Sequence, residues 1–321
     1  FRIRLVTAEQ AAQQQPANGP RSTQQPATTQ QHSGARNTRA PAPTGKGFIT
    51  TYAGQTLKLF NGGTATLGSS RRSPGHQDNE QIREVSLRRP FYLGVKEVTN
   101  AEFRLFLASH NSGTSNQQDL NGDAVAVANV SWQAAAMYCN WLSRRDSLPP
   151  FYQINFGEVL GVNPAATGYR LPTEAEWEWS GRYPPNGAAL DFPWGSQYPP
   201  GKNTDISENY ADASASGIVG DTLKRYNDGF AAVAPVGSFT PNLNGLYDMG
   251  GNVAEWTHDL YSAVPNKSGG LDPLGPTSGS AHVIKGASWS QSSRVALRFS
   301  YRDFGDKARD DVGFRLARYA Q

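Results

Sequence analysis

Short apolar runs separated by glycine and polar turns make up the chain from residue 48 onward. Alternating or β-branched apolar residues within such runs are typical of β-strands. They predict short strands at residues 56–60, 85–87, 91–93, 282–284 and 312–317.

Three helices are indicated by the residues that would cap their N-termini. Thr99 with Glu102, and Thr173 with Glu176, fit the capping box, in which the Thr hydroxyl and the Glu carboxylate each accept a backbone N–H. Ser131 is the expected cap of the third helix, whose apolar stripe contains Ala135, Tyr138, Trp141 and Leu142. A few helices among many short strands predict an α+β domain.

The N-terminal part of the chain has a different texture. Residues 1–7 alternate apolar and basic side chains and are interpreted as the end of an upstream domain. Residues 8–47 contain no Val, Ile, Leu, Met, Phe, Tyr or Trp and are rich in Ala, Gln, Pro and Thr. Burial of such a segment cannot offset its ordering entropy, so a flexible linker is predicted, followed by one compact domain at 48–321.

Composition and charge narrow the classes of function. The chain has 321 residues, 37% of them hydrophobic, with 33 Gly and 21 Pro, which predicts many turns and few long helices. No run approaches the roughly 20 apolar residues that a membrane span requires. Residues 1–47 hold six basic side chains and one acid, whereas the rest holds 24 basic and 26 acidic side chains. The predicted domain therefore gives no electrostatic case for nucleic-acid binding.

Six phrases occur in a recognisable order along the predicted domain. They read NGGTATLGS at 61–69, PFYLGVKEVTN at 90–100, GYRLPTEAEWE at 168–178, GLYDMGGNVAEW at 245–256, KGASW at 285–289 and VGFRLA at 312–317. Together they resemble the formylglycine-generating enzyme family, also called sulfatase-modifying factor domains. The resemblance implies a C-type-lectin-like fold with long irregular loops. The family includes copper-dependent cysteine oxidases, non-heme iron sulfoxide synthases, pigment-maturation enzymes and non-catalytic binding proteins, so the fold does not name the reaction.

The copper ligands of the oxidases are absent. In those enzymes two cysteines follow the KGASW-like phrase, and the matching positions are Gln291 and Ala296. Copper(I) is a soft ion that prefers thiolates, which neither side chain supplies. The single cysteine, Cys139, lies on the apolar stripe of a predicted helix and is expected to be buried and inert. The resemblance therefore implies no copper and favours a protein that is not an enzyme.

The sequence also offers residues for two other kinds of reactive site. An iron site could be assembled from His258, Asp259 and His282. The acids Glu174, Glu176 and Glu178 could form a pair for acid/base catalysis. Their place in the first turns of a predicted helix, where the helix dipole favours negative charge, makes a structural role the better interpretation.

The resemblance also implies two calcium loops, which would hold one or two structural ions through carboxylates and backbone carbonyls. The alternative is that these are glycine-rich turns whose acids accept backbone N–H groups. The matching residues of the first loop are Asn209, Tyr210, Asp228 and Phe230, and those of the second are Asp248, Gly251, Val253 and Glu255.

The segment before residue 312 is charged and contains aromatic residues. It could line a ligand groove through Arg and Tyr anchors, or form internal salt bridges. The groove candidates are Trp289, Arg298, Tyr301, Arg302, Asp303 and Arg309.

These observations predict a non-catalytic, calcium-stabilised module that binds a ligand or acts as an accessory subunit. A protein or peptide partner would contact residues 1–47 and the loop at 289–310. The alternatives are an oxidoreductase with a rebuilt metal site and a diversified C-type-lectin-like receptor. Available calcium favours a location outside the cytoplasm, in the periplasm or at the cell surface.

Overall fold

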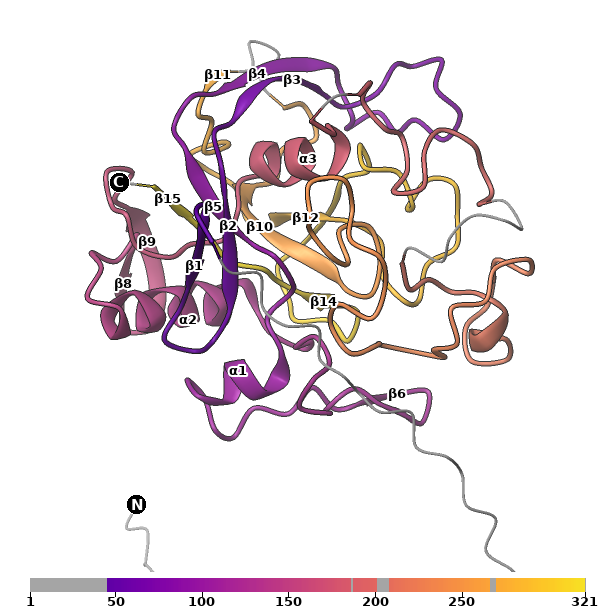
Figure 1. Cartoon of the computed structure of the whole chain (residues 1–321), viewed down its shortest axis with the longest axis horizontal. Helices are drawn as coiled ribbons and strands as arrows, with labels where there is room; N and C mark the ends of the chain where they lie inside the picture. Colours follow the sequence, from indigo (N-terminus) through magenta and orange to yellow (C-terminus); the bar gives the residue numbers. More distant parts are fainter. Residues whose placement is uncertain (1–44, 186, 201–207, 266–269, 321) are drawn as a thin grey trace, which may run out of the picture. The chain divides into compact units, whose positions relative to one another are not determined.

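The computed structural model describes residues 45–185, 187–200, 208–265 and 270–320 (Figure 1). The predictions for residues 1–7, and for the linker as far as residue 44, lie outside the described residues. No helix in these ranges is long and apolar enough to cross a membrane.

The described strands form several small sheets and no single continuous sheet. Two have four strands each, in the orders β1-β2-β5-β15 and β13-β12-β10-β14, and a third has the order β11-β4-β3. Two hairpins, β6-β7 and β8-β9, complete the described strands. The strands are β1 (Phe48–Thr50), β2 (Thr56–Phe60), β3 (Gly63–Leu67), β4 (Arg83–Leu87), β5 (Phe91–Gly94), β6 (Thr114–Ser115), β7 (Gln118–Asp119), β8 (Tyr152–Asn155), β9 (Glu158–Val162), β10 (Ala254–Leu260), β11 (Gly270–Leu271), β12 (His282–Lys285), β13 (Asp303–Gly305), β14 (Val312–Gly313) and β15 (Ala317–Tyr319).

Four of the five predicted strands are confirmed within a few residues, and one prediction was wrong. Residues 312–317 were expected to form a single strand, but β14 and β15 belong to different sheets. Between them the carbonyls of Phe314 and Leu316 accept hydrogen bonds from the N–H groups of Val98 and Gly94. The chain therefore crosses from one sheet to the other along this segment.

The predicted helix starts are confirmed. α1 (Asn100–Arg104) and α3 (Glu174–Arg182) begin after Thr99 and Thr173, and each has a complete capping box. α2 (Trp132–Arg145) begins after Ser131, whose hydroxyl accepts a hydrogen bond from Ala134 N at 3.2 Å. A 3₁₀ turn, η1 (Ala213–Ala215), lies in the later loops. Few helices, small sheets and long connections make this an α+β fold with irregular loops.

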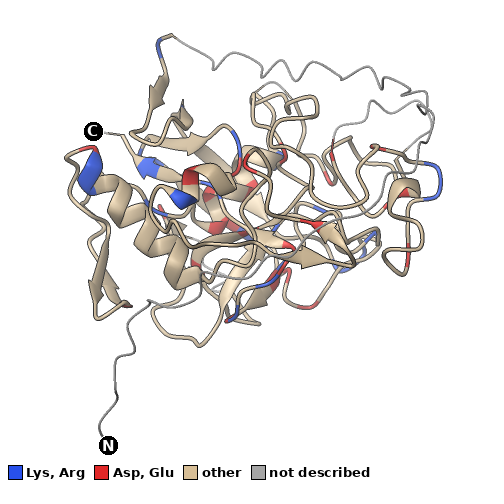
Figure 2. Cartoon of the chain, turned by 90° about the horizontal axis from the view of Figure 1, so that it is seen from below, with Lys and Arg blue, Asp and Glu red and all other residues tan. Residues whose placement is uncertain are grey.

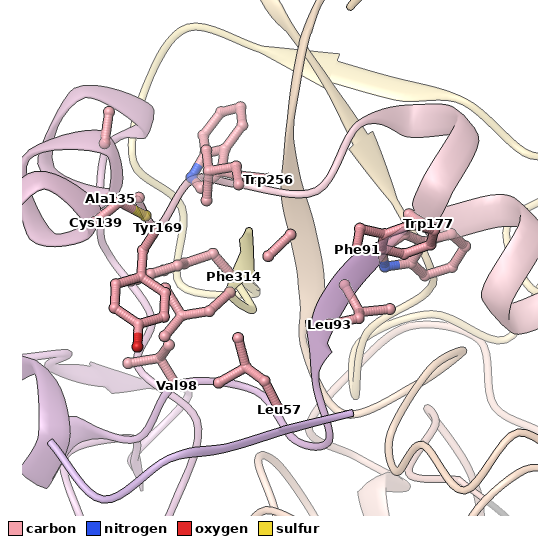
Figure 3. Packing of buried hydrophobic residues seen from close by; sticks show 14 of the residues in the cluster. Leu57, Phe91, Leu93, Val98, Ala135, Cys139, Tyr169, Trp177, Trp256 and Phe314 are labelled. Carbon is pink, nitrogen blue, oxygen red and sulfur yellow. The ribbon is translucent and has the colours of Figure 1, made fainter. Parts of the chain in front are cut away.

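The main core joins α2, α3 and strands of both four-stranded sheets (Figure 3). Two smaller apolar clusters support the long loops after α3. One contains Trp289 with Val253, and the other contains Tyr210 with Ala287 and Leu297. The later loops are thus anchored on clusters of their own.

Candidate functional site

The two predicted calcium loops and the segment around Gln291 form one hydrogen-bonded unit, here called the loop cluster (residues 208–230, 248–255 and 286–292). Asn252 N donates to Asn209 O at 2.9 Å, and Trp289 N donates to Asn252 O at 2.8 Å. Ala211 N donates to Gln291 O at 3.0 Å. Any ion held by the loop cluster would therefore stabilise all three segments.

In the first of the two predicted calcium loops, Asp228 accepts hydrogen bonds from backbone N–H groups. Asp228 accepts hydrogen bonds from Tyr210 N at 2.9 Å and from Phe230 N at 2.8 Å. Burial raises the pKa of Asp228 to about 7, against the effect of these two hydrogen bonds. The side-chain oxygen of Asn209, Oδ1, is buried and has no hydrogen-bond partner. The loop thus shows N–H capping by Asp228 and leaves an oxygen of Asn209 for a cation.

In the second loop Glu255 is already engaged by a cation of the protein itself. Its carboxylate accepts hydrogen bonds from Arg315 Nε at 2.9 and 2.7 Å and from Trp177 Nε1 at 2.8 Å. Arg315 Nη2 also donates to the carbonyls of Tyr247 and Asp248 at 3.0 and 3.3 Å. The guanidinium thus neutralises the carboxylate of Glu255, which does not fit as a calcium ligand.

Two other carboxylates at the second loop keep an oxygen without a partner. Asp248 accepts from Gly237 N at 2.6 Å through Oδ2, while its Oδ1 is buried and unpartnered. Glu208, which the sequence reasoning missed, accepts from Gly250 N at 3.2 Å and has a buried, unpartnered Oε2. Burial raises the pKa of Asp248 to about 6, and burial and then Asp248 raise the pKa of Glu208. Such oxygens fit a hard cation such as calcium.

The two loops approach closely because residue 251 has no side chain. A Cβ built at Gly251 would lie 2.6 Å from the carbonyl oxygen of Asn209 and 2.9 Å from Cβ of Glu208. Val253 is buried beside Trp289. The position of Glu208 directly before Asn209 was the only sequence signal for its role.

Each of the three iron candidates has other side-chain or backbone partners. His258 Nδ1 lies 3.4 Å from Tyr152 Oη, and His282 stacks on Trp132 with ring centroids 3.6 Å apart. Asp259 accepts a hydrogen bond from Glu174 N at 2.7 Å. Across the described residues, no group of three or more His, Cys, Asp or Glu side chains could hold a metal ion.

The burial of His282 against Trp132 predicts how the stability of the protein changes with pH. Burial lowers its pKa from 6.5 to about 4. The unfolded chain takes up a proton below pH 6.5 that the folded protein refuses, so stability falls as the pH falls through this window. We expect the free energy of unfolding of the wild type, minus that of H282F, to decrease by about 2 kcal/mol from pH 8 to pH 5 in urea titrations. A difference that stays constant with pH would contradict this.

The three acids of α3 are structural, as the sequence favoured. Glu174 pairs with Arg302 at 2.7 Å and with Arg83 at 2.9 Å. Burial alone would raise the pKa of Glu174, but Arg302 and Arg83 hold it well below its ordinary value. Figure 2 marks acidic segments in red and basic segments in blue along the chain. The other pairs are Arg170–Glu176 at 2.6 Å, and Lys285–Glu178 and Arg182–Glu178, each at 3.0 Å.

Four of the six groove candidates form ion pairs within the described fold. Arg298 binds Glu80 and is 4% exposed, and Arg302, which binds Glu174, is 3% exposed. Arg309 pairs with Asp303 at 2.7 Å. For these four candidates, Arg298, Arg302, Asp303 and Arg309, the structure shows the internal salt-bridge alternative.

Two aromatic groove candidates remain. Trp289 is 2% exposed, and its Nε1 is buried without a partner. Tyr301 is half-buried, and burial and then Asp303 raise its pKa.

Nothing at the copper positions can act as a soft ligand. Gln291 Oε1 accepts a hydrogen bond from Ser288 N at 3.2 Å, and Ala296 is buried. Cys139 lies in the main core (Figure 3), whereas Trp289, two residues before Gln291, belongs to another cluster. Burial raises the pKa of the Cys139 thiol, so it remains protonated and unreactive.

Comparison with known proteins gives one family. The sulfatase-modifying factor enzyme 1-like domain matches residues 50–320. The formylglycine-generating enzyme of Mus musculus is 31% identical over 278 residues, covering 75% of this chain and 71% of the relative. The inactive C-alpha-formylglycine-generating enzyme 2 of Bos taurus is 28% identical over 296 residues, covering 82% and 89%. The solved structure of Treponema denticola variable protein 1 matches with a TM-score of 0.68 and 26% identity, covering 85% of this chain and 98% of that one.

Proposed function

This chain belongs to the sulfatase-modifying factor enzyme 1-like family, and from that premise we propose that it is a non-catalytic module that binds a protein or peptide partner. Its loop cluster is stabilised by calcium. It acts as an accessory subunit. A non-catalytic role is compatible with the family, because one of the relatives is named inactive.

The observation that carries this proposal is the pair of side chains at the copper positions. Gln291 is hydrogen-bonded within its own turn and Ala296 is buried. Neither holds copper(I), which prefers thiolates. The sole thiol of the chain, Cys139, is fully buried in the main core. The chain therefore lacks the thiolate ligands that would hold copper for the oxidation of a substrate cysteine by oxygen.

Calcium is proposed from the oxygens that lack partners. Asn209 Oδ1, Glu208 Oε2 and Asp248 Oδ1 are all buried in or beside the loop cluster. A hard cation would satisfy them and offset the cost of burying these oxygens without a hydrogen-bond partner. Calcium supplies no chemistry here; it connects loops that have little regular structure. Its requirement favours a location outside the cytoplasm.

Metal content separates this proposal from an oxidoreductase. The full chain, purified in the presence of calcium, copper and iron salts and then desalted, is expected to retain calcium and no stoichiometric copper or iron by elemental analysis. The matched control is the variant N209A/D248A, which should lose the calcium. Stoichiometric copper or iron in the wild-type chain would instead support the oxidoreductase alternative.

A diversified receptor is a second candidate, favoured by the similarity to a variable protein. The segment 285–315 would be the variable one. However, Lys285, Arg298, Arg302 and Arg315 in that segment are buried and ion-paired, so free variation there would leave buried charges unpaired. A near-identical copy of the codons for 285–315 near the gene would support this candidate, and its absence would remove it.

A further inference from the structure

The tip of the β8-β9 hairpin carries an aromatic side chain that is exposed to solvent and attached to left-handed backbone. Phe156 is 99% exposed and has a φ of +49°. With Gly157 it forms the two-residue turn between the paired residues Asn155 and Glu158. Left-handed backbone favours Asn or Gly in such turns, and a bulky residue there costs about 1–2 kcal/mol. Leu160 on β9 is also 67% exposed. Neither fold nor turn requires these apolar groups, which indicates a role in contact.

An open groove of mixed polarity lies on the side of the β1-β2-β5-β15 sheet that carries Leu59, Tyr92 and Arg318, outside the loop cluster. Its volume is about 570 Å³. Its apolar lining consists of Ile49, Leu59, Pro90, Tyr92, Leu148 and Ala320, and its polar members are Asn61 and Arg318.

The charges of the two features are complementary. Arg318 lies over the rings of Tyr92 and Tyr169, at 5.9 and 5.7 Å, and forms no ion pair within the described part of the chain. Glu158, which directly follows the tip, is exposed and likewise without an ion pair there. An inserted Phe156 would bring Glu158 toward a guanidinium at the groove.

The hairpin and the groove are neighbours on the same molecule. Leu148, in the groove lining, precedes β8 by a few residues. Arg89 Nη1 donates to Pro164 O at 2.6 Å, which joins the residue next to Pro90 with the base of the hairpin. Because the hairpin tip projects beside the groove, two copies can be arranged around a two-fold axis so that each copy supplies one tip and one groove.

We propose that this chain self-associates as a two-fold dimer in which the Phe156 tip of each copy occupies the groove of the other. The occupant of the groove is thus a second copy of this chain, held by an apolar anchor and a Glu158–Arg318 pair. This interface does not depend on the proposed accessory function.

Sedimentation velocity of the full chain over a concentration series up to about 0.2 mM tests the dimer, since small interfaces often have micromolar dissociation constants. F156N keeps the turn and should weaken association roughly thirty-fold or more, the effect of a hot-spot residue. Its melting temperature as a monomer should equal or exceed that of the wild type, because Asn suits the left-handed position. L243N, which alters another exposed leucine (76% exposed), is the control and should leave association unchanged.

A charge reversal identifies the groove as the partner of the tip. E158R and R318E should each weaken the dimer, and the double variant E158R/R318E should restore it in part. A wild-type chain that stays monomeric throughout the series would overturn the proposal. An F156N dimer as tight as the wild type, or no recovery in the double variant, would also overturn it.

Discussion

Replacing Arg315 with Met is expected to lower the free energy of unfolding by about 3–5 kcal/mol, the usual cost of leaving a buried charge without its partner. Arg315 is fully buried and binds the carboxylate of Glu255, which is 1% exposed. It also donates to the carbonyl of Gly94 at 3.1 Å and so connects β5 with the second loop. In the variant, Trp177 would remain as a donor to Glu255.

Urea denaturation measures this loss, and a double variant shows its cause. E255L/R315M removes both charges, and replacing a buried ion pair by apolar residues is often neutral or stabilising. We therefore expect the double variant to recover much of the stability lost in R315M. A loss below about 1 kcal/mol in R315M would show that Glu255 has another cation partner. Full rescue of R315M by calcium would mean the same.

Calcium at a thousand times its dissociation constant is expected to add about 4 kcal/mol to the free energy of unfolding, because it binds only the folded loops. The variants N209A and D248A each remove an oxygen that has no protein partner in the structure. Both should reduce the gain sharply, measured as the difference between denaturation curves in calcium and in chelator.

The matched control is D306N, which removes an exposed acid outside the loop cluster. Its gain from calcium should equal that of the wild type. Magnesium should give a smaller gain, since it demands near-octahedral geometry and gives up its water reluctantly. Equal stability of the wild type in calcium and in chelator would contradict the calcium proposal.

Local chemistry made the helix starts predictable from sequence. A capping box needs residues three apart, as in Thr173 and Glu176, so the signal lies within one turn. The break between β14 and β15 was not predictable, because it depends on distant N–H groups of Val98 and Gly94.

Several candidate site residues form ion pairs with residues that lie far away in the sequence. Arg298 meets Glu80 across 218 positions and Arg302 meets Glu174 across 128, which no local pattern indicates. Glu255 has the ligand chemistry of a calcium site, but Arg315, 60 positions later, reaches it in the fold. The lack of thiols at residues 291 and 296, in contrast, can be identified from the sequence alone, because it does not depend on any residue that lies far away along the chain.

The claim that this chain does not oxidise cysteines is tested most directly by looking for the product. The full chain is incubated with copper(I), a thiol reductant, air and a peptide containing one cysteine, and any aldehyde is captured with a hydrazide reagent and detected by mass spectrometry. The formylglycine-generating enzyme of Mus musculus serves as a positive control. We expect no aldehyde beyond that of the protein-free mixture, whereas several aldehydes formed per chain would contradict the account.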